Sequence, residues 1–355
     1  MQVGNGDCPH TLFYGPSGAG KKTLILALLR EIYGAGVEKL KVECKPWTIE
    51  LPSRKLEVEF TTVSSAYHVE LNPSDVGNND RYVVQEIIKA FLVLGGLSKG
   101  PTERQQKWGA RLRRMNEMAR NRPVGTDGQR VFKVLVLNEV DRLSKEAQHG
   151  LRRTMEKYSA ACRLVLCCNN VSKVIEPVRS RCLCVRVRSP SHQEMQDVLE
   201  RVSLAENLTI PESLLDRLVG SSQRNLRRAL LSLEACKAQQ YPFSDSQEVP
   251  APDWELYVQE IVGDLTREQT PKNLYLVRGK LYELLVNCIP PEVVLRRLAV
   301  ELMRKLDDEL KHSTAAHAAF YEHRLQEGSK AIMHLEAFVA KFMADYKAFM
   351  LTAFG

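Results

Sequence analysis

The sequence predicts an α/β domain with a parallel sheet and helices on both faces, followed by a small helical domain and an all-α C-terminal domain. A glycine-rich loop spans residues 15–23, between a strand-like and a helix-like segment. Apolar runs of strand length then alternate with helical patterns up to about residue 189. Beyond residue 190, apolar residues recur only at helical spacing. These observations give both the fold class and the order of the domains.

The first domain, residues 1–189, is predicted to build its sheet from short apolar strands. The first strand enters the glycine-rich loop, and Gly34 ends the helix that leaves it. A further helix is predicted over residues 80–92. The predicted strands cover residues 11–14, 66–71, 131–137, 163–168 and 183–187.

Two helical domains are predicted after the sheet. Residues 190–240 form a small one with breaks at Pro211 and Gly220, and residues 241–252, rich in proline, serine and acidic residues, form a linker. Residues 253–355 are predicted to form a five-helix array, broken at Pro271 and near Pro290. Its apolar residues could form a self-contained core or partly a surface for neighbouring subunits, and the sequence leaves both open.

The composition is that of a soluble globular protein. The 355 residues are 44% hydrophobic and 26% charged. No apolar run approaches the roughly 18 residues needed to cross a membrane, and no signal-peptide pattern precedes the glycine-rich loop. We therefore predict a cytosolic or nuclear protein that does not contact membranes.

The cysteines and the net charge give little further information about function. The nine cysteines have no metal-ligand spacing, so we predict reduced thiols, no disulfides and no metal cluster. The net charge is +7, but residues 97–130 alone carry nine basic and three acidic residues. The rest of the chain is nearly neutral, so a nucleic-acid argument must depend on particular positions.

The glycine-rich loop is typical of phosphate binding. Such loops need glycines so that backbone N–H groups can surround phosphate oxygens, a lysine for the β- and γ-phosphates, and a hydroxyl that holds Mg²⁺. Here the hydroxyl position is occupied by Lys22. The candidate nucleotide-binding residues are Gly15, Pro16, Ser17, Gly18, Ala19, Gly20, Lys21, Lys22 and Thr23.

The acidic element that usually accompanies such a loop is also altered. The strand 131–137 leads into Asn138 and Glu139, where a metal-binding Asp normally precedes the Glu. Asn138 is a poor ligand for a hard cation, and Lys22 adds positive charge to the same place. We therefore predict nucleotide binding without hydrolysis and doubtful Mg²⁺ coordination, with Lys22 neutralising phosphate charge instead. Local shifts of Thr23 and Asp141 could still restore a metal site.

Several further motifs occur over nearly the whole chain. They are LRRTME at 151–156, Asn169, RSRC at 179–182, NLRRAL at 225–230, YEHRL at 321–325 and LEAFV at 335–339. With these motifs the chain resembles the AAA+ clamp-loader family, and most closely the small subunits of eukaryotic replication factor C. One class of these subunits resembles this chain in having the same two departures, Lys22 and Asn138.

The resemblance implies roles for individual residues around the nucleotide. Arg181 matches an arginine finger that acts in trans on the γ-phosphate bound by an adjacent subunit, and Glu139 is the catalytic residue of the degenerate acidic motif. Asn169 matches the sensor that faces the γ-phosphate, and Arg227 the sensor on the helical lid. The alternatives, a surface arginine, a turn-forming asparagine and a solvated helix arginine, stay open for each.

A DNA-binding face is implied as well. Lys145, Gln148 and Arg152 are three and four residues apart, so they share one face of a helix that Ser144 caps. In the family such helices follow the DNA backbone, and Arg81 is a weaker candidate. Phosphate contacts would give binding without sequence preference. A solvated charged face is the alternative.

The implied function is that of a clamp-loader subunit. It would join the other replication factor C subunits in a hetero-pentamer that binds ATP or ADP, opens the sliding clamp and loads it on primer-template DNA in the nucleus. Two alternatives remain, an independent AAA+ ATPase motor and a truncated isoform that cannot join the complex. The family's N-terminal Lys-Tyr-Arg-Pro signature is not found in this sequence, and residues 90–116 form an atypical insertion, which we expect to be disordered and without function.

Overall fold

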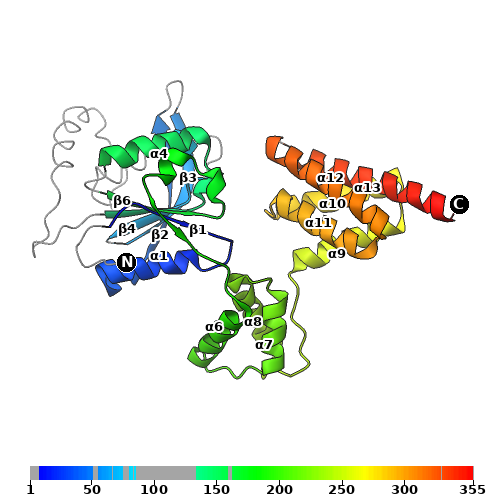
Figure 1. Cartoon of the computed structure of the whole chain (residues 1–355), viewed down its shortest axis with the longest axis horizontal. Coiled ribbons are helices and arrows are strands. Elements are labelled where there is room, and N and C mark those ends of the chain that lie inside the picture. The colour runs from blue at the N-terminus through cyan, green and yellow to red at the C-terminus, as the bar shows by residue number, and fades with distance from the viewer. Residues whose placement is uncertain are drawn as a thin grey trace, which may run out of the picture. The chain divides into compact units, whose positions relative to one another are not determined.

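The computed structural model describes residues 8–50, 55–65, 67–74, 80–82, 84, 133–158, 162–328 and 330–354. The chain divides into two compact units, Met1–Val249 and Pro250–Gly355 (Figure 1). The boundary falls inside the stretch 241–252 that the sequence predicts to be a linker. The predicted insertion 90–116 and most of the predicted helix 80–92 lie outside the described residues.

A mixed seven-stranded sheet, counted over the described residues, forms the centre of the first unit. Its strand order is β2-β3-β4-β5-β6-β1-β7. Strands β4, β5, β6, β1 and β7 run parallel and coincide with the five apolar runs of the sequence. The strands are β1 (Thr11–Tyr14), β2 (Lys41–Glu50), β3 (Lys55–Ser64), β4 (His68–Leu71), β5 (Lys133–Leu137), β6 (Cys162–Cys168) and β7 (Leu183–Arg186).

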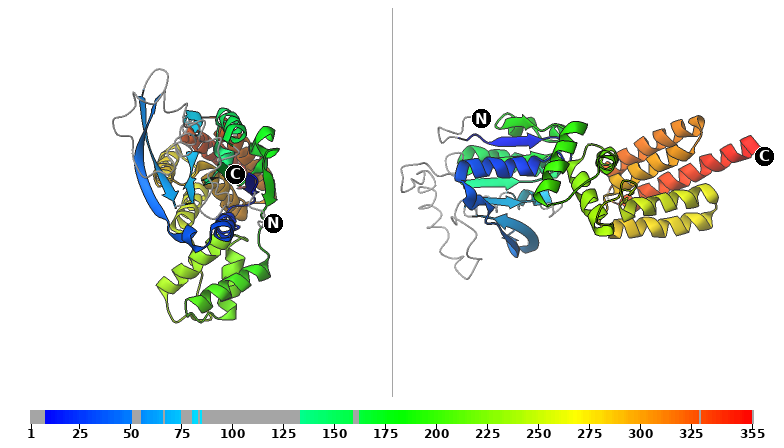
Figure 2. Two further views of the ribbon diagram at one scale, coloured as in Figure 1. Left: turned by 90° about the vertical axis from the view of Figure 1, so that its left-hand side faces the viewer. Right: turned by 90° about the horizontal axis from the view of Figure 1, so that it is seen from below.

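The predicted parallel sheet is extended at one edge by antiparallel strands. Strands β2 and β3 form an antiparallel hairpin with pairs from Lys41 beside Ser64 to Glu50 beside Lys55, and β3 also pairs antiparallel with β4. The hairpin projects beyond the rest of the sheet (Figure 2). Its strands alternate charged and apolar residues, as in the stretch 55–60, so they contain no continuous apolar run that would predict a buried strand.

Helices cover both faces of the sheet, each over its own apolar core. Leu135 and Leu137 of β5 point to the face covered by α4 (Lys145–Tyr158) and α5 (Glu176–Arg179). Val134 and Val136 alternate with them and pack under α1 (Lys21–Tyr33). Short 3₁₀ turns complete the domain: η2 (Ala35–Glu38), η5 (Val140–Arg142) and η6 (Val171–Lys173).

Three helices of the first unit form the small domain that follows the sheet. They are α6 (His192–Ala205), α7 (Glu212–Ser221) and α8 (Leu226–Gln239). Ser191 and Glu194 form a reciprocal capping box that starts α6, and Asn225 caps α8. Met195, Leu199 and other buried side chains give these helices an apolar core of their own.

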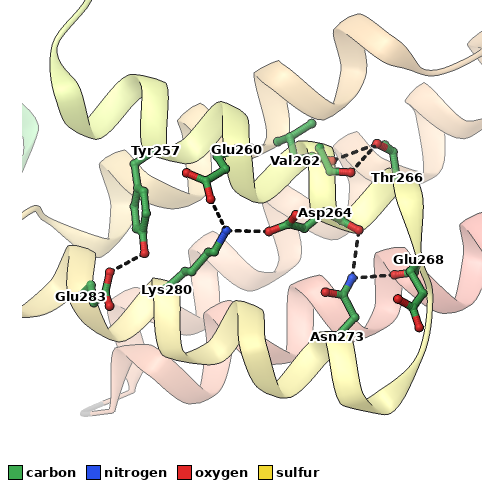
Figure 3. A network of polar contacts seen from close by, with 10 residues as sticks. Tyr257, Glu260, Val262, Asp264, Thr266, Glu268, Asn273, Lys280 and Glu283 are labelled. Carbon is green, nitrogen blue, oxygen red and sulfur yellow. Dashed lines mark hydrogen bonds and ion pairs between the residues drawn. The ribbon is translucent and has the colours of Figure 1, made fainter.

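Among the described residues of the second unit, all regular secondary structure is helical, and the helices share an apolar core that includes Phe338. Lys280 of α10 contacts Glu260 at 2.5 Å and Asp264 at 2.7 Å, so ion pairs join α9 to α10 (Figure 3). No helix of the described residues is both long and apolar enough to cross a membrane. The helices are α9 (Asp253–Arg267), α10 (Pro271–Val286), α11 (Pro291–Lys305), α12 (Asp308–Glu327) and α13 (Ala331–Phe354).

Candidate nucleotide-binding site

The ammonium group of Lys21 lies inside the glycine-rich loop, at the first residue of α1. Its Nζ donates to the carbonyl oxygens of Gly15 and Pro16, both at 2.7 Å, and to Oδ1 of Asn169 at 2.9 Å. Desolvation by burial lowers the pKa of Lys21. A buried cation at a helix N-terminus is the environment that a phosphate group favours. The structure thus brings together the loop lysine and the predicted sensor, two residues 148 positions apart.

Two glycines of the loop lie against neighbouring segments. A Cβ atom at Gly15 would lie 2.0 Å from the carbonyl oxygen of Val187, and one at Gly18, where φ is +74°, would lie 1.7 Å from Oδ1 of Asn225. Any side chain at either position would clash. The loop is therefore fitted closely to β7 on one side and to the start of α8 on the other.

The helix α8 also bonds directly to the loop. The backbone N–H of Leu226 donates to the carbonyl oxygen of Gly18 at 3.1 Å. Arg227 is the next residue of this helix, is exposed, and lies close enough for its charge to contribute to the lowered pKa of Lys21, after desolvation. The predicted lid arginine is thus placed beside the loop.

Asp141 is engaged with the loop that carries the predicted sensor. Its Oδ2 accepts from the backbone N–H groups of Asn169 and Asn170, at 3.1 and 3.0 Å. These contacts fix the turn after β6 through one carboxylate oxygen, while the other, Oδ1, is buried and has no hydrogen-bond partner among the described residues. Glu139 has a left-handed backbone, with φ of 52°, and its side chain pairs with Arg142 at 3.1 Å.

The two residues that depart from the phosphate-loop motifs meet at a single carboxylate. Nζ of Lys22 lies 2.6 Å from Oε1 of Glu70, and Nδ2 of Asn138 donates to the same oxygen at 2.7 Å. Glu70 lies on β4, beside Val136 of β5. Side chains of paired residues share a face of the sheet, so Glu70 points to the same face as Val136, which packs under α1. Asn138 comes two residues after Val136 and lies on this face as well. Lys22 reaches it from the first turn of α1.

These residues do not fit the magnesium ion that such a loop usually holds. A hard cation needs several oxygen ligands, whereas here an ammonium group stands at the hydroxyl position and an amide at the carboxylate position. Thr23 is exposed, and Oδ2 of Asp141 already accepts two backbone N–H groups. Its Oδ1 has no hydrogen-bond partner in the described ranges, but one free carboxylate oxygen is fewer than the several oxygen ligands that a hard cation needs. In the part of the chain that the structure describes, no three His, Cys, Asp or Glu side chains are grouped to hold a metal.

Arg181 lies at the opposite edge of the sheet from the loop of its own chain. In the parallel pair of β1 and β7, Thr11 is beside Leu183 and Tyr14 beside Arg186. The loop follows the C-terminal end of β1, whereas Arg181 precedes the N-terminal end of β7. A strand of this length spans about 10 Å. Arg181 therefore lies at the end of these strands opposite to the phosphate site of its own chain.

A carboxylate of α4 holds this arginine in place. Nη2 of Arg181 contacts Oε1 of Glu156 at 2.6 Å, and Nε of Arg152 contacts the same oxygen at 3.4 Å. Desolvation acts to raise the pKa of Glu156, but the hydrogen bonds from Arg152 and Arg181 outweigh it and hold that pKa below its ordinary value. Nη1 of Arg181 also donates to the carbonyl oxygen of Pro177 at 2.8 Å.

The predicted DNA-binding residues do not all share one surface. Lys145 is exposed at the start of α4, and the Arg152 side chain, two turns further on, keeps 43% of its surface exposed. Arg81 joins them, because its Nη1 contacts Glu146 of the same helix at 3.0 Å. These three cations form the basic surface of α4.

The expectation that Gln148 contacts DNA is wrong. Its side chain is only 1% exposed. Nε2 donates to the carbonyl oxygens of Leu143 and Lys173, both at 3.1 Å, and Oε1 accepts from the N–H of Ile175 at 2.8 Å. One face of α4 packs against the domain core, and a polar side chain can lie on that face when it finds hydrogen-bond partners there. Gln148 ties α4 to the segment that leads to α5.

Replacing Gln148 by alanine is expected to destabilise the first unit by about 1–3 kcal/mol, because buried backbone groups lose their partner. Denaturant unfolding of the full chain, with hydrogen exchange on α4 and the segment 171–179, measures the loss. The control is Lys145→Ala, an exposed position on the same helix, for which we expect a change within about 0.5 kcal/mol. Equal stability of both variants would contradict the structural role of Gln148.

Two residues important to this geometry were not singled out in the sequence. Glu70 is an acidic residue inside a buried strand, and an acidic residue there is a signal that the sequence offers. Glu156 ends the motif LRRTME, but its place on a helix gives no indication of a partner, because a glutamate on an exposed helix face is commonplace. Its partners come from separate elements, and only the folded chain brings them together.

Comparisons with known proteins agree along the whole chain. The model of the AAA family, "ATPase family associated with various cellular activities", matches residues 11–189. A model of the RCF1/5-like AAA+ ATPase lid domain matches residues 197–238, and one of the C-terminal domain of replication factor C subunit 3 matches residues 254–350.

Curated relatives match at high identity. Replication factor C subunit 5 of Oryza sativa subsp. japonica is 56% identical over 353 residues, which cover 99% of this chain and 92% of the relative. Replication factor C subunit 3 of Arabidopsis thaliana is 55% identical with the same coverage. Replication factor C subunit 3 of Homo sapiens is 52% identical over 97% of this chain and 88% of its own length.

Proposed function

The chain belongs to the small subunits of replication factor C, a group of AAA+ ATPases, and from this premise we propose how it contributes to a clamp loader. The loader is a hetero-pentamer that uses ATP to open the sliding clamp and place it on primer-template DNA, in replication and repair. Within it, this chain binds ATP or ADP without hydrolysing it and supplies Arg181 to a neighbouring subunit. It acts in the nucleus.

The single observation that carries this proposal is the position of Arg181. The side chain is at the sheet edge opposite to its own loop, is exposed, and is fixed by Glu156 and Pro177. An arginine stays charged and can bind two oxygens of a phosphate, so it suits a trans contact with a γ-phosphate. Such a contact needs an adjacent subunit, as in a ring or spiral of AAA+ domains.

Nucleotide binding without hydrolysis is supported by the loop itself. Lys21 and the N-terminus of α1 provide a positive environment for phosphate, and Asn169 and Arg227 lie beside it. The position of the metal, by contrast, holds Lys22 and Asn138 on Glu70. This arrangement disfavours an independent ATPase motor, which would need a complete site of its own.

The basic surface of α4 is proposed to follow the DNA backbone. Lys145, Arg152 and Arg81 are surface cations on or against one helix, and none needs a particular base. Contacts of this kind make binding depend strongly on salt. If these cations are instead only solvated surface residues, replacing them by neutral residues should leave the DNA affinity of the complex unchanged.

Co-expression with the other four subunits tests the proposal. We expect this chain to co-purify in a five-subunit complex, and we expect clamp loading on primer-template DNA to require it. Failure to co-purify would favour the non-productive isoform. ATP turnover by the isolated chain, abolished by Lys21→Ala, would favour the independent motor.

A further inference from the structure

Glu70 is an unusual residue for its place in the fold. It lies within β4, a strand whose four residues are all buried, and only 6% of its surface is exposed. Burial of a carboxylate is unfavourable unless hydrogen bonds or opposite charge compensate it. Both kinds of compensation are present, from the ammonium group of Lys22 and the amide of Asn138.

The three side chains depend on one another. A hydroxyl residue in place of Lys22 would remove the charge that compensates the buried carboxylate. An aspartate in place of Asn138 would bring a second carboxylate to within about the same 2.7 Å that now separates Nδ2 from Oε1. The two departures from the phosphate-loop motifs are therefore one arrangement with Glu70 at its centre.

Although Lys22 is paired with a buried carboxylate, part of its side chain remains in contact with solvent. The Lys22 side chain is 55% exposed although its Nζ touches Glu70. Lys22 follows Lys21 directly at the N-terminus of α1, where phosphate oxygens bind. A divalent cation entering there would meet the ammonium group that Glu70 holds in place, and a phosphate oxygen would meet a hydrogen-bond donor already in position.

We propose that Lys22, held by the Glu70 carboxylate to which Asn138 also donates, replaces magnesium at this site, so that nucleotide binds with the same affinity in its metal-free and magnesium-bound forms. This inference rests on the nucleotide binding proposed above. Its new content is the role of Glu70 as the residue that positions Lys22, and the loss of metal dependence.

The test measures affinity of the purified full-length chain for fluorescent ADP in excess Mg²⁺ and in EDTA. For the unaltered chain we expect dissociation constants that agree within about twofold. Lys22→Thr offers a hydroxyl beside the Glu70 carboxylate, and its affinity is expected to become about tenfold or more higher with Mg²⁺ than without. Lys39→Thr, the same change at an exposed lysine away from the loop, is expected to behave as the unaltered chain.

Direct metal binding gives a second measurement. Mn²⁺ titrated into the ADP complex and followed by electron paramagnetic resonance is expected to bind to Lys22→Thr and to Lys22→Thr combined with Asn138→Asp, and not to the unaltered chain beyond what free ADP binds. Circular dichroism shows whether each variant is folded. If neither folds, the comparison of Mg²⁺ with EDTA on the unaltered chain decides alone.

The outcomes separate this inference from the proposed function. Binding of ADP to the unaltered chain only when Mg²⁺ is present would overturn the inference and leave nucleotide binding intact. No binding of ADP or ATP under either condition would overturn both. If the ratio of the ADP dissociation constants in EDTA and in Mg²⁺ is the same for Lys22→Thr as for the unaltered chain, the lysine does not replace the metal.

Discussion

Replacing Arg181 by alanine in the reconstituted five-subunit complex is expected to slow ATP hydrolysis about 10³-fold at the one neighbouring site that this residue completes. The reason is the loss of a positive charge that stabilises charge developing on the transferred phosphoryl group. Glu156 and the Pro177 carbonyl hold the arginine at the sheet edge, away from its own loop. The clamp- and DNA-stimulated ATP turnover of the whole complex should fall by the fraction that this one site contributes.

Lys21→Ala in the same subunit provides the informative comparison. It removes the cation that contacts Gly15, Pro16 and Asn169, and so it should weaken nucleotide binding in this chain. Because this site is proposed not to turn over, the stimulated hydrolysis of the complex should change little. Arg188→Ala, an exposed arginine just beyond the other end of β7, is the matched control. A large loss with Lys21→Ala and none with Arg181→Ala would mean that the degenerate loop hydrolyses ATP.

Replacing Phe338 by alanine is expected to destabilise the second unit by about 3–5 kcal/mol, through lost apolar burial and a cavity. The ring is fully buried in the core and packs edge-to-face against Tyr321, with ring centroids 6.2 Å apart. Denaturant unfolding of the full chain, with hydrogen exchange on residues 253–354, measures the change.

The control for this prediction is Phe320→Ala. Its ring is 52% exposed on α12 and packs edge-to-face against Tyr321, with ring centroids 5.2 Å apart, so the same deletion removes less buried surface than at Phe338. We expect a loss of about 1–2 kcal/mol. Equal losses in the two variants would contradict the stabilising role of the buried Phe338 ring.

The sequence predicted most of the parts that local patterns specify. The glycine-rich loop, the strands that enter the parallel part of the sheet and the helical end of the chain all follow from spacing within short segments. The hairpin of β2 and β3 was not predicted, because its alternating charged and apolar residues are typical of strands with one solvent-exposed face, whereas the prediction relied on continuous apolar runs. Boundaries between helical domains were within reach because proline and glycine mark them.

The contacts that join distant segments were beyond such reasoning. Lys22 and Asn138 each departed from a motif, and the sequence related them only through a metal that neither could bind. That they meet on Glu70 depends on the register of β4 with β5 and on the face toward which α1 packs. Gln148 shows the converse, since helical spacing placed it with Lys145 and Arg152 and the packing of α4 buried it.

The carboxylate shared by Lys22 and Asn138 also restricts how this site could change over generations. A single substitution at either position alters the charge around Glu70 while the other position is still adapted to the old arrangement. Effects of substitutions that share one partner are not additive. The three positions therefore form an epistatic group, in which a first step back toward a metal site is penalised until the second step follows. Selection acting on one position at a time would tend to keep this subunit out of the hydrolytic cycle.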